Sequence, residues 1–255
     1  MLLDLQPELL GLVLSNLENQ VDVSRCLQSC KSLLALKRDH HLCAQWLIKQ
    51  RPLQAMILAI ESNQQATALH LLKLPCPSCA LTAVDNFGDS VLHLAAAAKQ
   101  ENVMVELLRR PECRSMINHR NRNQETPLMV AAENGFLNMV QALTKQEGID
   151  LDAQGRCGHQ YWTALHRACR YGHSAVVRAL CQSGCDVNSP ALNNSWRPLM
   201  WACYSGHVEC VRALLEHPDV NVMAINSEGM SVFHVKPQYN VAEIESLLFV
   251  HLPVS

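Results

Sequence analysis

The sequence predicts an all-α protein in two parts: a short domain of three helices over residues 1–50 and a solenoid of stacked helix hairpins over residues 51–255. Three observations support this prediction. One order of residues recurs along the chain at intervals of 34 to 37 positions. Each copy carries two short apolar stripes at helical spacing, with a turn residue between them. The first fifty residues are rich in leucine but do not carry the recurring pattern.

The N-terminal part predicts three short helices. The segment from Leu5 to Leu17 places Pro7 in the first turn of a helix with a glutamate directly after it, and its leucines form a broad apolar face. A second helix is expected from Val21 to Leu27 and a third from about Lys31 towards Trp46. Roughly fifty residues bury too little surface to be stable alone. We therefore expect this leucine-rich surface to bind a partner.

The same segment resembles the F-box, a motif that binds a Skp-type adaptor. The opening leucines match it, as do Asp22-Val23, Cys30-Lys31 and Asp39 with Leu42, whereas Gln6 replaces the usual proline. The resemblance implies a substrate receptor of a Skp, cullin and F-box (SCF) ubiquitin ligase. The residues that it implies at the adaptor are Leu5, Pro7, Glu8, Leu9, Leu10, Val13, Leu14 and Leu17. The alternative is a helical cap that shields the first hairpin of the solenoid.

A boundary is expected near Arg51-Pro52, and the clearest hairpin beyond it runs from Trp162 to Asn188. Thr163 can cap a first helix, Gly172 permits a tight reversal, and a second helix ends near Gly184. The apolar stripes are Leu165, Ala168 and Cys169 in the first helix and Val176, Val177 and Leu180 in the second. Neither helix can bury its stripe alone, so each hairpin needs a copy of itself on both sides.

These copies resemble ankyrin repeats, which have a period of about 33 residues and a T-P-L-H-x-A core. The first core positions are Leu92, Leu128, Leu165, Leu199 and Phe233. Four repeats keep the register over residues 86–226, and divergent repeats are expected at 53–85 and 227–250. The insertions at Pro111–Ser115 and Gly155–His159 lie in connections between repeats.

The departures from the ankyrin pattern are local. Lys99 replaces the turn glycine of one copy, and Lys236-Pro237 replaces small residues in the last, which is expected to be a degenerate cap. The resemblance implies that a recurring first-helix histidine belongs to a structural hydrogen-bond lattice, and that a second histidine marks the start of the second helix. These residues are His93, His166 and His234, and then His173 and His207.

Composition limits the function. The chain has 49% hydrophobic and 17% charged residues, which predicts a sizeable core, and its net charge of -2 argues against non-specific nucleic-acid binding. The apolar start contains Asp4 and Glu8 and does not resemble a secretory signal. No window approaches the 18 or so uninterrupted apolar residues of a membrane span. We therefore expect a soluble protein of the cytoplasm or nucleus, with no membrane or nucleic-acid partner.

Aromatic and basic residues gather in the third and fourth repeats. Six of the eight Trp and Tyr residues lie between positions 161 and 204, and no Asp or Glu occurs from Ala153 to Cys185. We predict that this surface holds a protein segment with an acidic or phosphorylated side chain beside an apolar anchor. The candidate residues are Arg167, Arg170, Tyr171, Trp196, Trp201 and Tyr204. Alternatively, the arginines are only solvated and the aromatic rings only pack finger against finger.

No catalytic residue, metal ligand or cofactor site is predicted. Cys76 and Cys79 have the spacing of a zinc or redox pair, but no second pair follows at finger spacing, so a loop between repeats is expected. Cys169, Cys181, Cys203 and Cys210 fall at core positions, which favours reduced, packed thiols.

Four functions follow from these patterns. The first is the ligase substrate receptor, and the second is an ankyrin scaffold or inhibitor without any connection to a ligase. The third is an effector from an intracellular microbe that uses a host ligase, and the fourth, with least support, is an enzyme. Binding of a Skp-type adaptor distinguishes the first two.

Overall fold

The computed structural model describes residues 54–74 and 81–251. The F-box-like helices expected over residues 1–50 and the pair Cys76 and Cys79 lie outside these ranges. The chain divides into two units, residues 1–80 and 81–255. Within the first unit, α5 (Ala55–Glu61) and α6 (Gln65–Lys73) pack together as a helix hairpin, at the position expected for the divergent repeat at 53–85.

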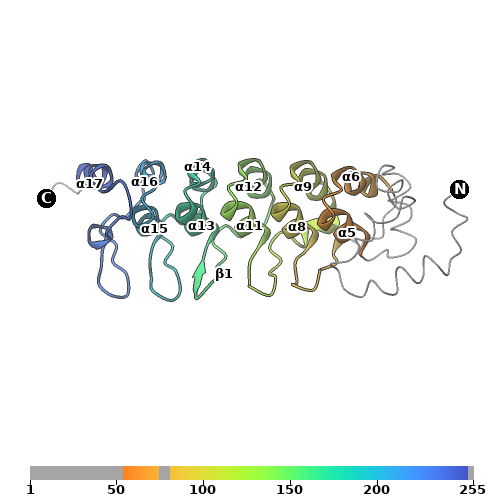
Figure 1. Ribbon diagram of the computed structural model, residues 1–255, viewed down its shortest axis with the longest axis horizontal. Helices are drawn as coiled ribbons and strands as arrows, with labels where there is room; N and C mark the ends of the chain where they lie inside the picture. The colour runs from red at the N-terminus through yellow and green to blue at the C-terminus, as the bar shows by residue number, and fades with distance from the viewer. Residues whose placement is uncertain (1–53, 75–80, 252–255) are drawn as a thin grey trace, which may run out of the picture. The chain divides into compact units, whose positions relative to one another are not determined.

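The second unit is a stack of helix hairpins. First helices α8, α11, α13 and α15 lie side by side in one row, and second helices α9, α12, α14, α16 and α17 form a second row, above the first in Figure 1. Its elements are α8 (Val91–Ala97), α9 (Glu101–Leu108), α10 (Pro111–Arg114), α11 (Pro127–Glu133), α12 (Leu137–Thr144), β1 (Gly155–Cys157), β2 (Gln160–Trp162), α13 (Ala164–Tyr171), α14 (Ser174–Gln182), α15 (Pro198–Tyr204), α16 (Val208–Leu215), η1 (Val232–His234) and α17 (Val241–Val250).

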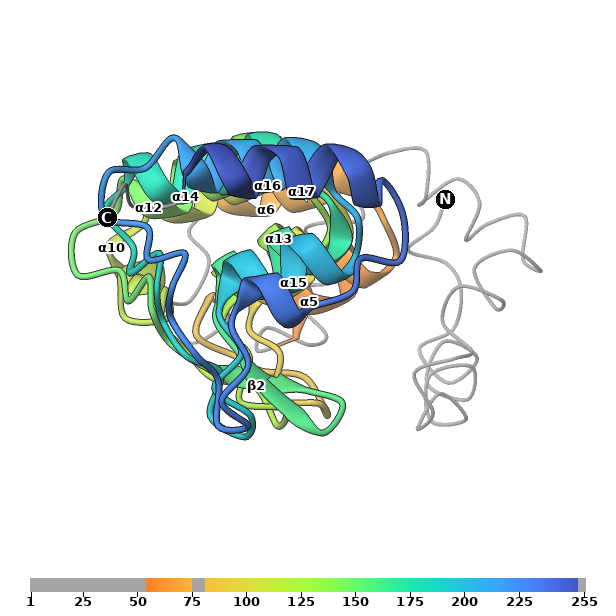
Figure 2. The ribbon, with the colours of Figure 1, turned by 90° about the vertical axis from the view of Figure 1, so that its left-hand side faces the viewer.

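The predicted apolar stripes form the core of this stack. Leu165, Ala168 and Cys169 on α13 are at most 1% exposed, and the stripe of α14 is equally buried. Each first helix packs on the first helix of the next hairpin, and the second helices do the same. The end-on view shows the resulting layers, with the connecting fingers projecting beyond the first row (Figure 2). The fold is therefore the repeat solenoid that the periodicity predicts.

One finger corrects the expectation of an all-α chain. β1 and β2 pair antiparallel, with Gly155 opposite Trp162 and Cys157 opposite Gln160. The insertion in this connection makes a finger long enough for a two-stranded hairpin, which turns at Gly158 with φ +61°. Gly155 allows the finger to approach its neighbour, because a Cβ there would lie 2.6 Å from the carbonyl oxygen of Gln124. The fold is therefore mostly helical.

The lattice histidines have the structural role that the resemblance implies. The Nδ1 atom of His166 accepts a hydrogen bond from the Thr163 hydroxyl at 2.8 Å, and its Nε2 atom donates to the carbonyl of Trp196 in the next repeat at 3.0 Å. His93 makes the corresponding pair of bonds, reaching the carbonyl of Glu125 at 2.8 Å. His234 bonds the Ser231 hydroxyl at the start of η1. The rings of His93 and His166 therefore join neighbouring repeats, because each bonds a backbone carbonyl of the next repeat.

The second set of histidines also lies where predicted. His173 and His207 are the N-cap residues of α14 and α16. The Nε2 atom of His207 bonds the carbonyl of Arg170 in the preceding repeat at 3.2 Å, above the turn at Gly172. Gly172 has φ +83°, and a Cβ at this position would lie 2.7 Å from the His207 ring. The turn therefore needs glycine both for its backbone conformation and for the close approach of the ring.

The departures from the repeat pattern have local effects. Lys99 adopts φ +55°, the same left-handed turn that glycine makes elsewhere, and its Nζ lies 5.5 Å from the ring centroid of Phe136. In the last copy, the first helix is reduced to the short 3-10 turn η1, because Pro237 cannot continue a helical hydrogen-bond ladder. The expected degenerate cap therefore consists of this turn and α17.

Protonation of His166 is expected to destabilise the fold. Complete burial lowers the pKa of its imidazole from 6.5 to about 4. The unfolded chain therefore binds a proton below about pH 6.5 that the folded chain binds only near pH 4, so stability falls as the pH drops through this window. At pH 5 the loss relative to pH 7 is about 2 kcal/mol from this residue.

Urea unfolding at pH 7 and pH 5 measures this effect. His166→Gln is expected to lose about 2 kcal/mol less between the two pH values than the unmodified chain does, because it removes the titrating ring. His159→Gln, at an exposed position in the β1-β2 turn, is the control and should leave the pH dependence unchanged. Equal pH dependence in the unmodified chain and His166→Gln would contradict the assignment.

Candidate functional site

The predicted substrate residues of the fourth repeat form one aromatic cluster. The ring of Trp201 lies 4.7 Å from that of Trp196 and 6.0 Å from that of Tyr204, and the rings of Trp196 and Tyr204 are 5.6 Å apart, measured between centroids. All three side chains are half-buried. We call these three residues together with Arg170 the aromatic-arginine surface.

Local structure brings these rings together. Trp201 and Tyr204 are three residues apart on α15, so they lie on the same face of the helix. Pro198 occupies the first turn of this helix, and Trp196 precedes it in the finger. Trp162 at the end of β2 completes the cluster from the preceding repeat, with its ring centroid 4.7 Å from that of Trp201. The cluster therefore joins the third and fourth repeats.

Arg170 places a positive charge beside the rings. Its guanidinium carbon lies 5.9 Å from the Tyr204 ring centroid, and its Nη1 donates to the Ser205 hydroxyl at 3.2 Å. This is the only hydrogen bond of its side chain within the described part of the chain, so four of the five N–H groups of the guanidinium remain available to another acceptor. The neighbouring Tyr171 is 45% exposed. An anionic group of a bound segment can therefore meet Arg170 at the edge of an apolar surface.

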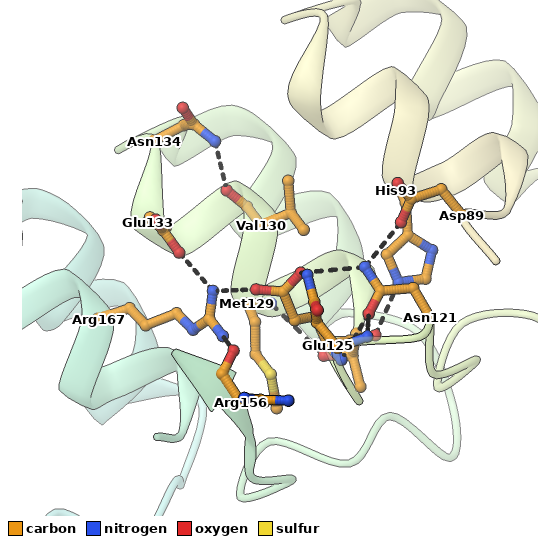
Figure 3. A network of polar contacts seen from close by, with 12 residues as sticks. Asp89, His93, Asn121, Glu125, Met129, Val130, Glu133, Asn134, Arg156 and Arg167 are labelled. Atoms are coloured by element: carbon orange, nitrogen blue, oxygen red, sulfur yellow. Dashed lines mark hydrogen bonds and ion pairs between the residues drawn. The ribbon is translucent and has the colours of Figure 1, made fainter. Parts of the chain in front are cut away.

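Arg167 does not have the predicted placement. Its side chain is 1% exposed, and its Nη1 donates to Glu125 at 2.7 Å and also to Glu133. Nη2 donates to the carbonyl of Arg156 at 2.9 Å, so the guanidinium joins α13 to α11 and to the adjoining fingers (Figure 3). The repeat register predicts the face of α13 on which Arg167 lies. It does not show that carboxylates of the preceding repeat bind this side chain. Because the side chain of Arg167 is buried, it is not on the surface where the sequence analysis placed it as a substrate contact.

The pKa shifts of Glu125 and Arg167 both favour the charged form. Burial alone would raise the pKa of Glu125, but hydrogen bonds from Asn121 and the charge of Arg167 hold that pKa below its usual value. Burial would lower the pKa of Arg167, but the carboxylates of Glu125 and Glu133 raise it. Two carboxylates surround one guanidinium, so this network does not attract an anion. An acidic ligand is expected on the Arg170 side instead.

Three supporting features were not predicted from the sequence. Trp162 packs into the aromatic cluster, Ser205 holds Arg170, and Glu125 with Glu133 neutralises Arg167. A repeat-by-repeat alignment of charges could have indicated the last, because Glu133 lies 34 residues before Arg167, one repeat period away. The indole N–H groups of Trp162 and Trp201 are buried, and neither has an acceptor among the described residues.

The other predicted sites lie elsewhere or outside the described ranges. The residues implied at a Skp-type adaptor, from Leu5 to Leu17, fall outside them. Among residues 54–74 and 81–251, no group of His, Cys, Asp and Glu side chains is arranged to hold a metal ion. Within the same ranges, no helix is both long and apolar enough to cross a membrane.

Comparison with known proteins agrees with the architecture. A family model described as ankyrin repeats (three copies) matches residues 56–155 and 154–226. The crystal structure of EF0377, an ankyrin repeat protein, superposes with a TM-score of 0.68 at 20% identity, covering 77% of this chain and 97% of that one. At this identity the structural likeness concerns the fold alone.

The curated relatives share only a small part of their length with this chain. The mouse serine/threonine-protein kinase TNNI3K is 31% identical over 112 residues, 44% of this chain and 13% of the kinase. The tyrosine-protein kinase HTK16 of Hydra vulgaris is 33% identical over 115 residues, 44% of this chain and 14% of that kinase. Mouse ankyrin repeat and SAM domain-containing protein 6 is 38% identical over 77 residues, 30% of this chain and 8% of that protein. The kinase matches fall in the ankyrin regions of those proteins.

Replacing Arg167 tests its structural role. Arg167→Met is expected to lower the free energy of unfolding by about 3 kcal/mol, because it leaves two partly buried carboxylates without their partner. Arg156→Ala is the matched control, since Arg156 contributes its backbone carbonyl to the network and its own side chain is exposed. Urea unfolding followed by circular dichroism measures both. Equal stabilities of the two variants would contradict this role.

Proposed function

The chain belongs to the ankyrin repeat family, and on this premise we propose that it is a non-catalytic adaptor whose aromatic-arginine surface holds an acidic or phosphorylated segment of another protein. Ankyrin repeats bind protein partners. The observation that supports an acidic or phosphorylated ligand is the position of Arg170, whose guanidinium lies against Tyr204 at the margin of the tryptophan cluster. A cationic group next to exposed aromatic area is a common anchor for protein segments.

Local charge supports an acidic ligand. From Ala153 to Val208 the only acidic residue is Asp186, which follows the C-terminal end of α14. Glu133 is the last residue of α11; its side chain is 33% exposed and is paired with Arg167. A phosphate beside Arg170 can therefore accept hydrogen bonds from the guanidinium with few carboxylates nearby. A phosphate beside Glu133 would be repelled by the carboxylate of that residue. We expect the anionic group to contact Arg170 and the apolar group to contact Trp196 and Trp201.

Selection from a peptide library tests this surface. A library containing acidic, phosphoserine and neutral peptides is selected on the immobilised full chain, and the affinity of a recovered peptide is measured by fluorescence anisotropy. Arg170→Gln and Trp201→Ala are each expected to weaken binding at least tenfold, which is about 1.4 kcal/mol. Arg212→Gln on α16 is the matched control, because this arginine lies on the second row, paired with Glu209 and Glu243.

Circular dichroism of every variant separates lost binding from lost folding. Recovery of mainly neutral or basic peptides would contradict the predicted ligand chemistry. Equal affinity of Arg170→Gln, Trp201→Ala and the unmodified chain would contradict the location of the site.

The connection to a ubiquitin ligase is a second proposal, carried by the resemblance of residues 1–50 to the F-box. In this proposal the leucine-rich face binds a Skp-type adaptor with its cullin ligase core, and the repeats hold the substrate, in the cytoplasm or nucleus. Recruited subunits then transfer ubiquitin, so the chain itself needs no catalytic residue. The alternative is a scaffold or inhibitor that uses the same repeats without a ligase.

Co-purification with a Skp-type adaptor distinguishes these alternatives. Leu9→Asp combined with Leu14→Asp is expected to abolish capture of the adaptor, because it places two charges on the apolar docking face. The helical circular dichroism of the repeats should persist in this variant. Failure of the unmodified chain to capture the adaptor would leave the scaffold or inhibitor as the function.

A further inference from the structure

The hairpin formed by η1 and α17 has one side that no other described element covers. α17 packs on α16, and η1 packs on α15. Figure 2 looks onto the opposite side of α17, and no other helix lies in front of it. The hairpins from α11 to α16 each pack between two neighbours, whereas this one packs on a single neighbour within residues 81–251.

Apolar side chains gather on this uncovered side. Val241 and Phe249 lie eight residues apart on α17, so they share one face of the helix, and they are 44% and 62% exposed. The ring centroid of Phe249 lies 6.3 Å from that of Phe233 on η1. The neighbouring Val250 is also exposed. Exposed apolar side chains grouped in this way are typical of a surface that binds another protein.

Two adjoining hollows shape the same side. The first has a volume of about 350 Å³ and lies between η1 and α17, and its lining includes Val232, Phe233, Val235, Ile244, Leu248 and Phe249. The second is lined by Phe233, Val235, Pro237 and Val241 together with the charged residues Lys236 and Glu245. We call Phe233, Val235, Lys236, Pro237, Val241, Glu245 and Phe249 the end surface.

The two charges of the end surface have no partner within residues 54–74 and 81–251. Lys236 and Glu245 are both exposed, and neither forms an ion pair there, although both line the second hollow. By contrast, Glu243 on the same helix pairs with Arg212 of α16 at 3.5 Å. The end surface therefore offers one unpaired cation and one unpaired anion beside an apolar centre.

This charge pattern favours a second copy of the chain over other partners. A purely acidic segment would be repelled by Glu245, and a purely basic one by Lys236. A second copy related by a two-fold axis presents an anion to the cation and a cation to the anion. In such an interface the same surface serves both copies, so each contact occurs twice.

We propose that the end surface binds the end surface of a second copy, forming a two-fold symmetric dimer in which Lys236 of each copy meets Glu245 of the other. Phe249 and Val241 then lie in the apolar centre of the interface, and the ion pairs lie at its rim. The proposal is independent of the proposed binding function, because the aromatic-arginine surface is built from α13, α15 and the fingers.

Sedimentation equilibrium of the full chain under reducing conditions tests the dimer. The unmodified chain is expected to reach the mass of a dimer at concentrations up to about 100 μM, since small symmetric interfaces often have micromolar dissociation constants. Phe249→Asp should raise the dissociation constant at least tenfold, because it places a charge in the apolar centre. Phe87→Asp is the matched control, since Phe87 is 67% exposed on a different finger, and it should leave the dissociation constant unchanged.

Exchange of the two charges tests the symmetry. Lys236→Glu and Glu245→Lys are each expected to weaken self-association at least tenfold, because each variant sets like charges against one another in both contacts. An equimolar mixture of the two variants should form a mixed dimer, since each copy supplies the charge that the other lacks. Native mass spectrometry with one variant labelled with nitrogen-15 identifies this dimer.

Circular dichroism confirms that each variant is folded, and the charge variants change only exposed side chains. A monomeric unmodified chain at every concentration would overturn the proposal, and would mean that another segment or partner covers the end surface. A dimer that persists in Phe249→Asp, or that is lost only in the Leu9→Asp and Leu14→Asp double variant, would overturn it as well. Absence of the mixed dimer would overturn the two-fold pairing of Lys236 with Glu245.

Discussion

Each hairpin of this chain has an apolar stripe on both helices that only another hairpin can cover, and this dependence on neighbours organises the rest of the structure. In the second unit, first helices pack on first helices and second helices on second helices, so each stripe is covered by a neighbouring hairpin. Polar groups then fix the register between repeats. His93 and His166 cap their own helices and bond a carbonyl one repeat ahead, and Arg167 bonds three groups of the preceding repeat and its finger.

This arrangement also explains how the aromatic-arginine surface is built. The rings around Trp201 come from two repeats and from the fingers between them, so their geometry depends on the contact between those repeats. Arg167 is buried towards the preceding repeat and is neutralised by the carboxylates of Glu125 and Glu133, which leaves Arg170 as the cation beside the rings. In the proposed function, two arginines one helical turn apart have different roles: Arg167 stabilises the stack and Arg170 contacts the ligand.

The periodicity of the sequence predicted the hairpins and their apolar stripes, because these features recur in every copy, and the resemblance to ankyrin repeats implied the structural histidines. Features that occur once were predicted less well. The burial of Arg167 depends on Glu125 and Glu133, which lie 42 and 34 residues away, and a helical register alone cannot show that they reach it. The β1-β2 hairpin arises from an insertion in one finger, and η1 arises from Pro237 in the last repeat. The aromatic cluster was predicted from composition, whereas the contribution of Trp162 required the contacts across two repeats.

The central claim is that the chain holds its ligand at the aromatic-arginine surface. Three of the four tryptophans of the chain, Trp162, Trp196 and Trp201, lie in the cluster, so indole N–H signals in nuclear magnetic resonance report on it directly. A peptide that binds the full chain is titrated into the nitrogen-15-labelled protein. The account predicts saturable shifts of the Trp196 and Trp201 indole signals and of the Arg170 guanidinium signal. Saturable shifts confined to other residues, with these three signals unchanged, would contradict it.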